Sequence, residues 1–220
     1  MSAMSVPSSG IPAREKGDPP ASGEYTEAAM SDPARRRASY QDVLRAPPHK
    51  VAELIDGDLE LNPRPAGPHA RVASRLFGDL DGPFDRGRNG PGGWILLFEP
   101  ELHLGQDILV PDLAGWRRER LPAVPDAPYF SLAPDWVCEV VSPSTARLDR
   151  VTKLASYARE GIGHVWLLDP YARTLEVLRR ASEGWLFTAS HRDDQTIRAE
   201  PFDAVPLDLG GLWADLPPSR

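Results

Sequence analysis

Two acidic residues, Asp112 and Glu139, lie in apolar stretches of the sequence. Asp112 follows Pro111 in the segment ILVPDLAGW, and Glu139 stands between Cys138 and Val140 in DWVCEVVS. A carboxylate inside a buried strand is costly unless it is paired with a cation or bound to a metal. Two such carboxylates on neighbouring strands would form an oxygen-donor site suited to Mg²⁺ or Mn²⁺. This pattern favours metal-assisted phosphate chemistry, in which the cation polarises a phosphate and activates a water.

Simpler interpretations of both residues stay open at this point. An aspartate beside a proline is also typical of a turn or a strand end. A glutamate in a strand can be satisfied by an arginine on a neighbouring element, with no metal involved. The residue types alone therefore do not decide between a site and ordinary structural roles for Asp112 and Glu139.

A third candidate, Lys153, lies on a helix predicted from about Ala146 to Glu160 and ended by Gly161. The apolar residues of this helix are predicted to form a stripe that faces the core: Leu148, Val151, Leu154, Ala155 and Ala158. Lys153 lies far from that stripe, so its ammonium could reach a solvent-filled cleft and orient a water or neutralise a phosphate. The alternative is a surface ion pair with Asp149, four residues earlier, of small net value.

The elements that must position these residues belong to one α/β (α+β) domain, predicted over residues 39–213. Residues 1–38 are rich in Pro, Ser, Gly and Ala and are predicted to be a disordered tail, and residues 214–220 a C-terminal tail. A hairpin is predicted at Asp56-Gly57. The helix that opens at Pro68 carries its apolar residues on one face. Residues 81–93, rich in Gly and Arg, are predicted to be a loop.

The rest of the domain is predicted to be a mixed sheet flanked by helices. ILVPDLAGW is predicted as one strand with Asp112 at its middle, and DWVCEVVS as a buried central strand. The latter, the Lys153 helix and HVWLLDP form a βαβ unit, predicted to be a right-handed crossover with antiparallel strands elsewhere. TLEVLRR and GWLFTAS are predicted as two more strands, followed by a short helix near Leu212.

Composition limits the classes of function. The formal net charge is −7, which argues mildly against tight non-specific DNA binding. No apolar stretch is long enough to span a membrane, and the single cysteine, Cys138, cannot form an internal disulfide, so the cytoplasm is the expected compartment. Seven arginines near the candidate site either cluster to contact phosphates or are scattered solubilising charges: Arg86, Arg88, Arg117, Arg118, Arg120, Arg147 and Arg150.

Three segments together resemble one known family: ELIDGDLEL, VPDLAGWRRERLP and PDWVCEVVSPSTARLDRVTKLASYAREGIGHVWLLDP. Over roughly residues 40–180 the chain resembles the Uma-type restriction endonuclease family, once a domain of unknown function, within the PD-(D/E)XK nuclease superfamily. The resemblance implies a restriction-endonuclease-like fold, with Asp112 and Glu139 as catalytic and metal-binding carboxylates. Val141 stands where the superfamily's simplest form has a lysine, and Lys153 matches the lysine that the family carries on the next helix. Glu53 matches an acidic residue of the family and is expected to complete the metal shell.

Two hypotheses of function follow from these residues and from the resemblance. The first is a Mg²⁺- (or Mn²⁺-) dependent endonuclease that hydrolyses phosphodiester bonds of DNA, with Asp112, Glu139 and Lys153 catalytic. A homodimer is expected for it, because cutting both strands of a duplex needs two sites. The second is a non-catalytic protein that keeps the fold and acts as a binding or assembly module, as the absent strand lysine and the net charge allow.

Overall fold

The computed structural model describes residues 36–217. Residues 1–35 of the predicted N-terminal tail and residues 218–220 of the predicted C-terminal tail lie outside them. From Arg37 onward the chain forms one compact unit that holds every element named below. Ala38, assigned to the tail, donates its backbone N–H to the carbonyl of Gly57 at 2.8 Å.

The predicted hairpin at Asp56-Gly57 forms and belongs to a small sheet. Both turn residues have positive φ, 53° and 88°, as a type I′ turn requires. The sheet is antiparallel, and its strands run in the order β2-β1-β5-β4. Its strands and the short helix that precedes them are α1 (Tyr40–Leu44), β1 (Lys50–Ile55), β2 (Asp58–Pro63), β4 (Leu102–Leu104) and β5 (Asp107–Leu109).

The larger sheet has six strands in the order β10-β9-β8-β7-β6-β3. Only β7 and β8 pair in parallel, and the other pairs are antiparallel, so the predicted mixed sheet with one crossover is confirmed. All five residues of β7 are buried, as expected of a central strand. The strands are β3 (Trp94–Phe98), β6 (Leu113–Arg117), β7 (Trp136–Val140), β8 (His164–Asp169), β9 (Thr174–Ala181) and β10 (Gly184–Arg192).

The segment ILVPDLAGW is not one strand, as predicted, but two. Its first part is β5 in the small sheet and its second part is β6 in the large sheet, with Val110, Pro111 and Asp112 between them. Pro111 has no N–H to donate to a ladder, so the chain leaves one sheet there and enters the other. Asp112 therefore lies at the junction of the two sheets rather than in the middle of a strand.

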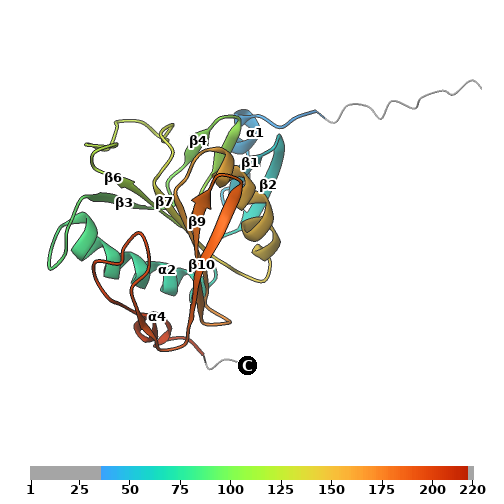
Figure 1. Ribbon diagram of the computed structural model, residues 1–220. Coiled ribbons are helices and arrows are strands. Elements are labelled where there is room, and N and C mark those ends of the chain that lie inside the picture. Colours follow the sequence, from blue (N-terminus) through green and yellow to red (C-terminus); the bar gives the residue numbers. More distant parts are fainter. Residues whose placement is uncertain (1–35, 218–220) are drawn as a thin grey trace, which may run out of the picture. The chain divides into compact units, whose positions relative to one another are not determined.

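Two hydrophobic clusters cover the two faces of the large sheet. Trp136, Cys138 and Val140 on β7 pack with the helices α2 (Gly67–Leu80) and α4 (Leu209–Trp213) on one face, so Cys138 lies in the core as expected. Val137, on the opposite face, packs with Tyr157 of the crossover helix and with the small sheet. Figure 1 shows α2 and α4 on one side of the large sheet and the small sheet on the other. Glu139 alternates onto the second face, beneath the crossover helix.

The remaining elements agree with the sequence in most places. The crossover helix consists of a π-helical turn and an α-helix, and Gly161 follows it with φ 81°, the predicted helix stop. Residues 81–93 were predicted to be a loop, yet they begin with a π-helical turn that continues α2 and buries Phe84. No described helix is long and apolar enough to cross a membrane. The elements are α2 (Gly67–Leu80), η1 (Asp81–Asp85), η2 (Leu148–Lys153), α3 (Leu154–Arg159), β11 (Thr196–Ile197), β12 (Leu207–Asp208) and α4 (Leu209–Trp213).

Candidate metal and phosphate site

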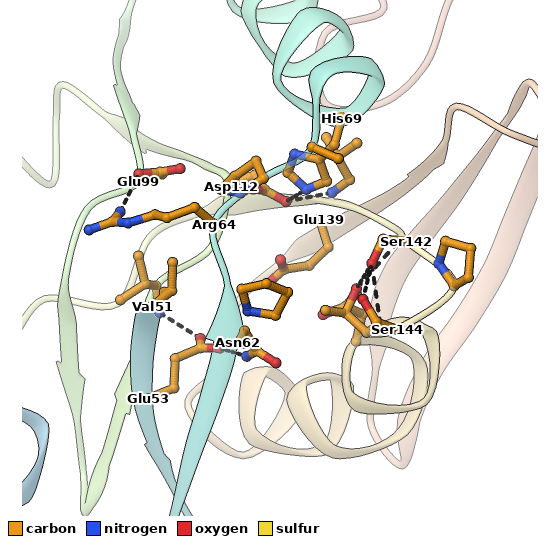
Figure 2. Close-up of a pocket in the computed structure, with 18 of the residues that line it drawn as sticks. Val51, Glu53, Asn62, Arg64, His69, Glu99, Asp112, Glu139, Ser142 and Ser144 are labelled. Carbon is orange, nitrogen blue, oxygen red and sulfur yellow. Dashed lines mark hydrogen bonds and ion pairs between the residues drawn. The ribbon is translucent and has the colours of Figure 1, made fainter. Parts of the chain in front are cut away.

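All four residues predicted for the site line one cavity of about 350 Å³. Asp112 comes from the sheet junction, Glu139 from β7, Glu53 from β1 and Lys153 from η2. Figure 2 shows Asp112, Glu139 and Glu53 around the same space. Other polar residues that line it are Asn62, Arg64, His69, Glu99, Ser142, Ser144, Thr145, Asp149 and Tyr171. Glu53 and Lys153, 100 positions apart in the sequence, thus meet where the two sheets and the crossover helix adjoin.

Asp112 is held between β7 and the first turn of α2. Its Oδ2 accepts a hydrogen bond from the backbone N–H of Val140 at 2.7 Å. The same oxygen lies 3.2 Å from Nε2 of His69, which Figure 2 shows above it. Burial lowers the pKa of His69, but the nearby Asp112 outweighs burial, and the net pKa is raised. These two contacts hold the Asp112 carboxylate beside the end of β7. The Asp112 side chain is 13% exposed and lines the cavity.

Lys153 is the buried cation of the site. Its Nζ lies 2.9 Å from Oε1 of Glu139 and 3.0 Å from Oε1 of Glu53, whereas Oδ1 of Asp149 is 4.0 Å away. Lys153 lines the cavity, as expected of a lysine that reaches a cleft, but its side chain is 4% exposed, so the alternative of a surface ion pair with Asp149 is wrong. Burial lowers the pKa of Lys153, but the two glutamates raise it well above its ordinary value. The ammonium is therefore charged at neutral pH.

Glu139 is buried beneath the crossover helix and has two donors on one oxygen. Lys153 approaches its Oε1, and the hydroxyl of Tyr157 donates to the same atom. Burial raises the pKa of Glu139 well above its ordinary value, against the opposing effect of Lys153. Burial likewise raises the pKa of Asp149 to about 6, with Lys153 and Thr145 opposing. The acidic groups repel one another and have a single buried cation to share, which favours the arrival of a further cation.

Glu53 uses both of its oxygens within the protein. Oε1 accepts from the backbone N–H of Val110 at 2.8 Å and lies 3.0 Å from Lys153. Oε2 accepts from Nδ2 of Asn62 at 3.2 Å. A glutamate on a hairpin is usually solvated, but Glu53 is 1% exposed. Glu53 is therefore the residue by which the small sheet contributes to the site, and within the site it contacts Lys153.

The prediction for the crossover helix holds only in part: Leu148 and Leu154 of the apolar stripe pack against the core, but the fully buried residues of the helix are mostly polar. The residues that it buries are Asp149, Lys153, Ser156 and Tyr157. Val151, placed in the apolar stripe, is 62% exposed, and Ala155 is exposed as well. The reason is that the helix packs over Glu139 and over Asp107, which accepts a hydrogen bond from the Ser156 hydroxyl at 2.7 Å. Polar partners beneath the helix decide which face turns inward.

Of the two alternatives left open for the seven arginines, clustering at the cavity is wrong, because none of them lines it. Three of them pair with aspartates elsewhere, at 2.6 to 2.7 Å, and Arg117 lies over the ring of Trp94 at 4.5 Å. The three pairs are Arg86–Asp81, Arg118–Asp85 and Arg120–Asp135. Within residues 36–217 the basic side chains that line the cavity are Lys153, Arg64 and His69. Arg64 is 57% exposed and lies 3.7 Å from Glu99, so it is available to a ligand at the rim.

The free carboxylate oxygens of the cavity are of the donor type that a hard divalent cation takes. In the described chain, the contacts of Asp112 use Oδ2 and those of Glu139 use Oε1, which leaves Oδ1 and Oε2 for a cation. Among residues 36–217, no three acidic, histidine or cysteine side chains are close enough together to enclose a metal ion. Mg²⁺ commonly takes one or two carboxylates and completes its shell with waters and phosphate oxygens. Asp112 and Glu139 would be the carboxylates of such a partial shell.

Sequence reasoning missed His69 and Tyr157. His69 is an isolated histidine in the first turn of α2, and no spacing links it to Asp112. Its Nδ1 is buried and has no hydrogen-bond partner among the described residues. Tyr157 did leave a signal, because it continues the spacing of four from Asp149 through Lys153. Residues four apart share a helix face, so the spacing places Tyr157 beside the lysine. Ser142 and Thr145 exchange hydrogen bonds in the turn before the crossover helix.

Comparison with known proteins supports the expected fold. No curated protein matches the chain. A crystal structure described as "a putative nuclease belonging to DUF820" from Anabaena variabilis ATCC 29413 is 22% identical, with a TM-score of 0.66. The match covers 80% of this chain and 98% of that one, and it confirms the nuclease-type α+β fold. The Uma2 family model, described as "Putative restriction endonuclease", matches residues 38–210. The chain therefore belongs to the Uma2 family.

Proposed function

We propose that the protein is a Mg²⁺- or Mn²⁺-dependent endonuclease that hydrolyses phosphodiester bonds of DNA. One observation carries the proposal: Asp112 at the sheet junction, Glu139 on β7 and Lys153 on the crossover helix line a single cavity. Acidic oxygens for a cation and an ammonium for a phosphate or a water are the groups that metal-dependent phosphodiester hydrolysis needs. Membership of a family described as "Putative restriction endonuclease" supports DNA as the substrate.

Each residue has a distinct task in this proposal. Asp112 and Glu139 would hold the cation, which supplies positive charge to the scissile phosphate and lowers the pKa of a bound water. Lys153 has three N–H donors, of which the two glutamates take two. The third is available to orient the attacking water or a phosphate oxygen. His69 and the Val140 N–H keep Asp112 in place.

Substrate contacts are proposed at the rim of the cavity. Arg64 is exposed there and could bind a phosphate of the DNA backbone in place of Glu99. Cutting both strands of a duplex needs two such sites, and a homodimer would supply them. The negative formal charge of the chain, −7, makes binding depend on the metal and on few basic contacts, so we expect a weak affinity for DNA without metal.

The test is a titration of Mg²⁺ and Mn²⁺ by calorimetry, followed by plasmid nicking, on wild type and on Asp112→Asn. Asp112→Asn keeps the size of the side chain and removes its charge, so we expect metal binding and nicking to be lost together. Asp126→Asn, the same change on an exposed aspartate, serves as the matched control and should retain both.

Two outcomes would overturn the proposal. If Asp112→Asn nicks DNA as fast as wild type, Asp112 is not a metal ligand needed for cleavage. A wild type that binds no metal and cuts no DNA would favour the non-catalytic binding or assembly module. Circular dichroism of Asp112→Asn shows whether the variant is folded, so that a lost activity can be assigned to the site.

A further inference from the structure

Glu53 differs from the other two acidic residues of the site in how its oxygens are used. Its three contacts occupy both oxygens: Val110 and Lys153 contact Oε1, and Asn62 contacts Oε2. Asp112 and Glu139 are each contacted through one oxygen in the described chain. A carboxylate whose two oxygens already accept protein donors is a poor ligand for a hard cation that needs a free oxygen.

The position of Lys153 depends on Glu53. The lysine has a flexible four-carbon stem, so its ammonium is placed only by the groups that it contacts. Those groups are Glu139 at 2.9 Å and Glu53 at 3.0 Å, with Asp149 at the 4.0 Å limit. A cation bound by Glu139 competes with the ammonium for that carboxylate. Glu53 is then the short contact that keeps the ammonium in the cavity.

The surroundings of Glu53 are built to hold it in one orientation. It is 2% exposed at its side chain, and its oxygens are fixed by a backbone N–H at the sheet junction and by an amide on β2. Val110 immediately precedes the Pro111-Asp112 pair. The Glu53 carboxylate therefore contacts Lys153 on the crossover helix and also the backbone of Val110, two residues before Asp112.

We infer that Glu53 is a positioning residue that acts through Lys153, and not a metal ligand. This inference rests on the proposed function, because it assigns a role within the same site. It replaces the expectation that Glu53 completes the metal shell. The simplest superfamily pattern has its lysine on a strand, whereas Lys153 lies on a helix. The contact with Glu53 explains how Lys153 can take the same role, because it holds the ammonium in place.

Glu53→Gln tests the inference, because the amide keeps the size and an acceptor oxygen but removes the charge facing Lys153. We expect the dissociation constant for Mg²⁺ or Mn²⁺, measured by calorimetry, to change less than about twofold, while kcat for nicking falls about 10- to 100-fold. Glu60→Gln, the same change on the residue that pairs with Glu53 across the hairpin, should leave both unchanged. In a Lys153→Met background that circular dichroism shows to be folded under the assay conditions, Glu53→Gln should cause no further loss of kcat, because the two residues act as one unit.

The outcomes separate this inference from the proposed function. A metal affinity that falls tenfold or more in Glu53→Gln, with activity restored by excess metal, would make Glu53 a ligand and overturn the inference alone. The inference would also be overturned if Glu53→Gln lowered kcat by the same factor in the Lys153→Met background as in wild type. A wild type without metal binding would overturn the proposed function itself. The metal titration decides the role of Glu53 even where cleavage is slow.

Discussion

Replacing Lys153 with Met should destabilise the fold strongly, because it leaves two buried carboxylates without their cation. Met keeps the apolar stem of the side chain, and the ammonium that it lacks lies 2.9 Å and 3.0 Å from Glu139 and Glu53. Both glutamate side chains are at most 4% exposed, so water cannot replace the ammonium. Removing one partner of a buried ion pair costs about 3–5 kcal/mol, and we expect a loss of that size at pH 8.

The stability lost in Lys153→Met should be smaller at acidic pH, and the direction of this pH dependence follows from the pKa of Glu139. Burial raises that pKa in the folded protein, and Lys153 is the group that lowers it. A group whose pKa is raised by folding stabilises the fold fully below its unfolded pKa and loses that contribution as pH rises through the folded pKa. Without Lys153 the folded pKa of Glu139 rises further. The Lys153→Met protein should therefore recover much of its stability near pH 4.5, where Glu139 is protonated.

The assay is urea denaturation at pH 4.5 and at pH 8, followed by the fluorescence of the six tryptophans. Lys50→Met is the matched control, because Lys50 lies at the edge of β1 and is only half-buried. Surface substitutions of this kind change stability by less than about 0.5 kcal/mol. A loss below about 1 kcal/mol for Lys153→Met at pH 8, or an equal loss at both pH values, would refute the view of Lys153 as the buried counter-ion.

Two further predictions concern the rim and the helix. Folding raises the pKa of Asp149 from 3.8 to about 6, which corresponds to roughly 3 kcal/mol lost as pH rises from 4 to 7. Asp149→Asn should therefore gain about 1–3 kcal/mol over wild type in urea unfolding at pH 7 and little at pH 4, and no gain at pH 7 would contradict this. Arg64→Ala should raise KM for DNA about 3- to 10-fold at low salt, with kcat unchanged. Steady-state nicking at two salt concentrations checks this, and an unchanged KM would exclude Arg64 as a phosphate contact.

Local chemistry made much of the fold predictable from the sequence. The Asp56-Gly57 turn, the glycine stop at Gly161 and the buried run around Glu139 each depend on neighbours in the sequence, and all three formed as predicted. The strand through Pro111 was wrong because strand membership depends on which sheet the chain joins, and that is a non-local choice. The proline, which cannot pair, was the signal in the sequence that a break was possible.

The candidate site was predictable only where a residue type conflicted with its surroundings. Glu139 among valines stood out, and so did Asp112 once it was paired with Glu139. His69 had no such conflict, because its partner Asp112 lies on another element and 43 positions away. Glu53 was assigned to the metal, and no sequence pattern could show that its oxygens are taken by Asn62 and by a backbone N–H. Contacts of this kind depend on tertiary packing.

The crossover helix shows why a simple amphipathic interpretation fails at a site. An ordinary core helix buries its apolar residues, and here Val151 faces solvent while Asp149, Lys153 and Tyr157 face inward. Burying three polar side chains costs stability unless each finds a partner. Lys153 and Tyr157 find theirs in Glu139, and Asp149 finds Lys153 and the Thr145 hydroxyl. A helix under selection for stability alone would have no reason to keep these buried polar residues, so they are themselves physical support for a site at Glu139.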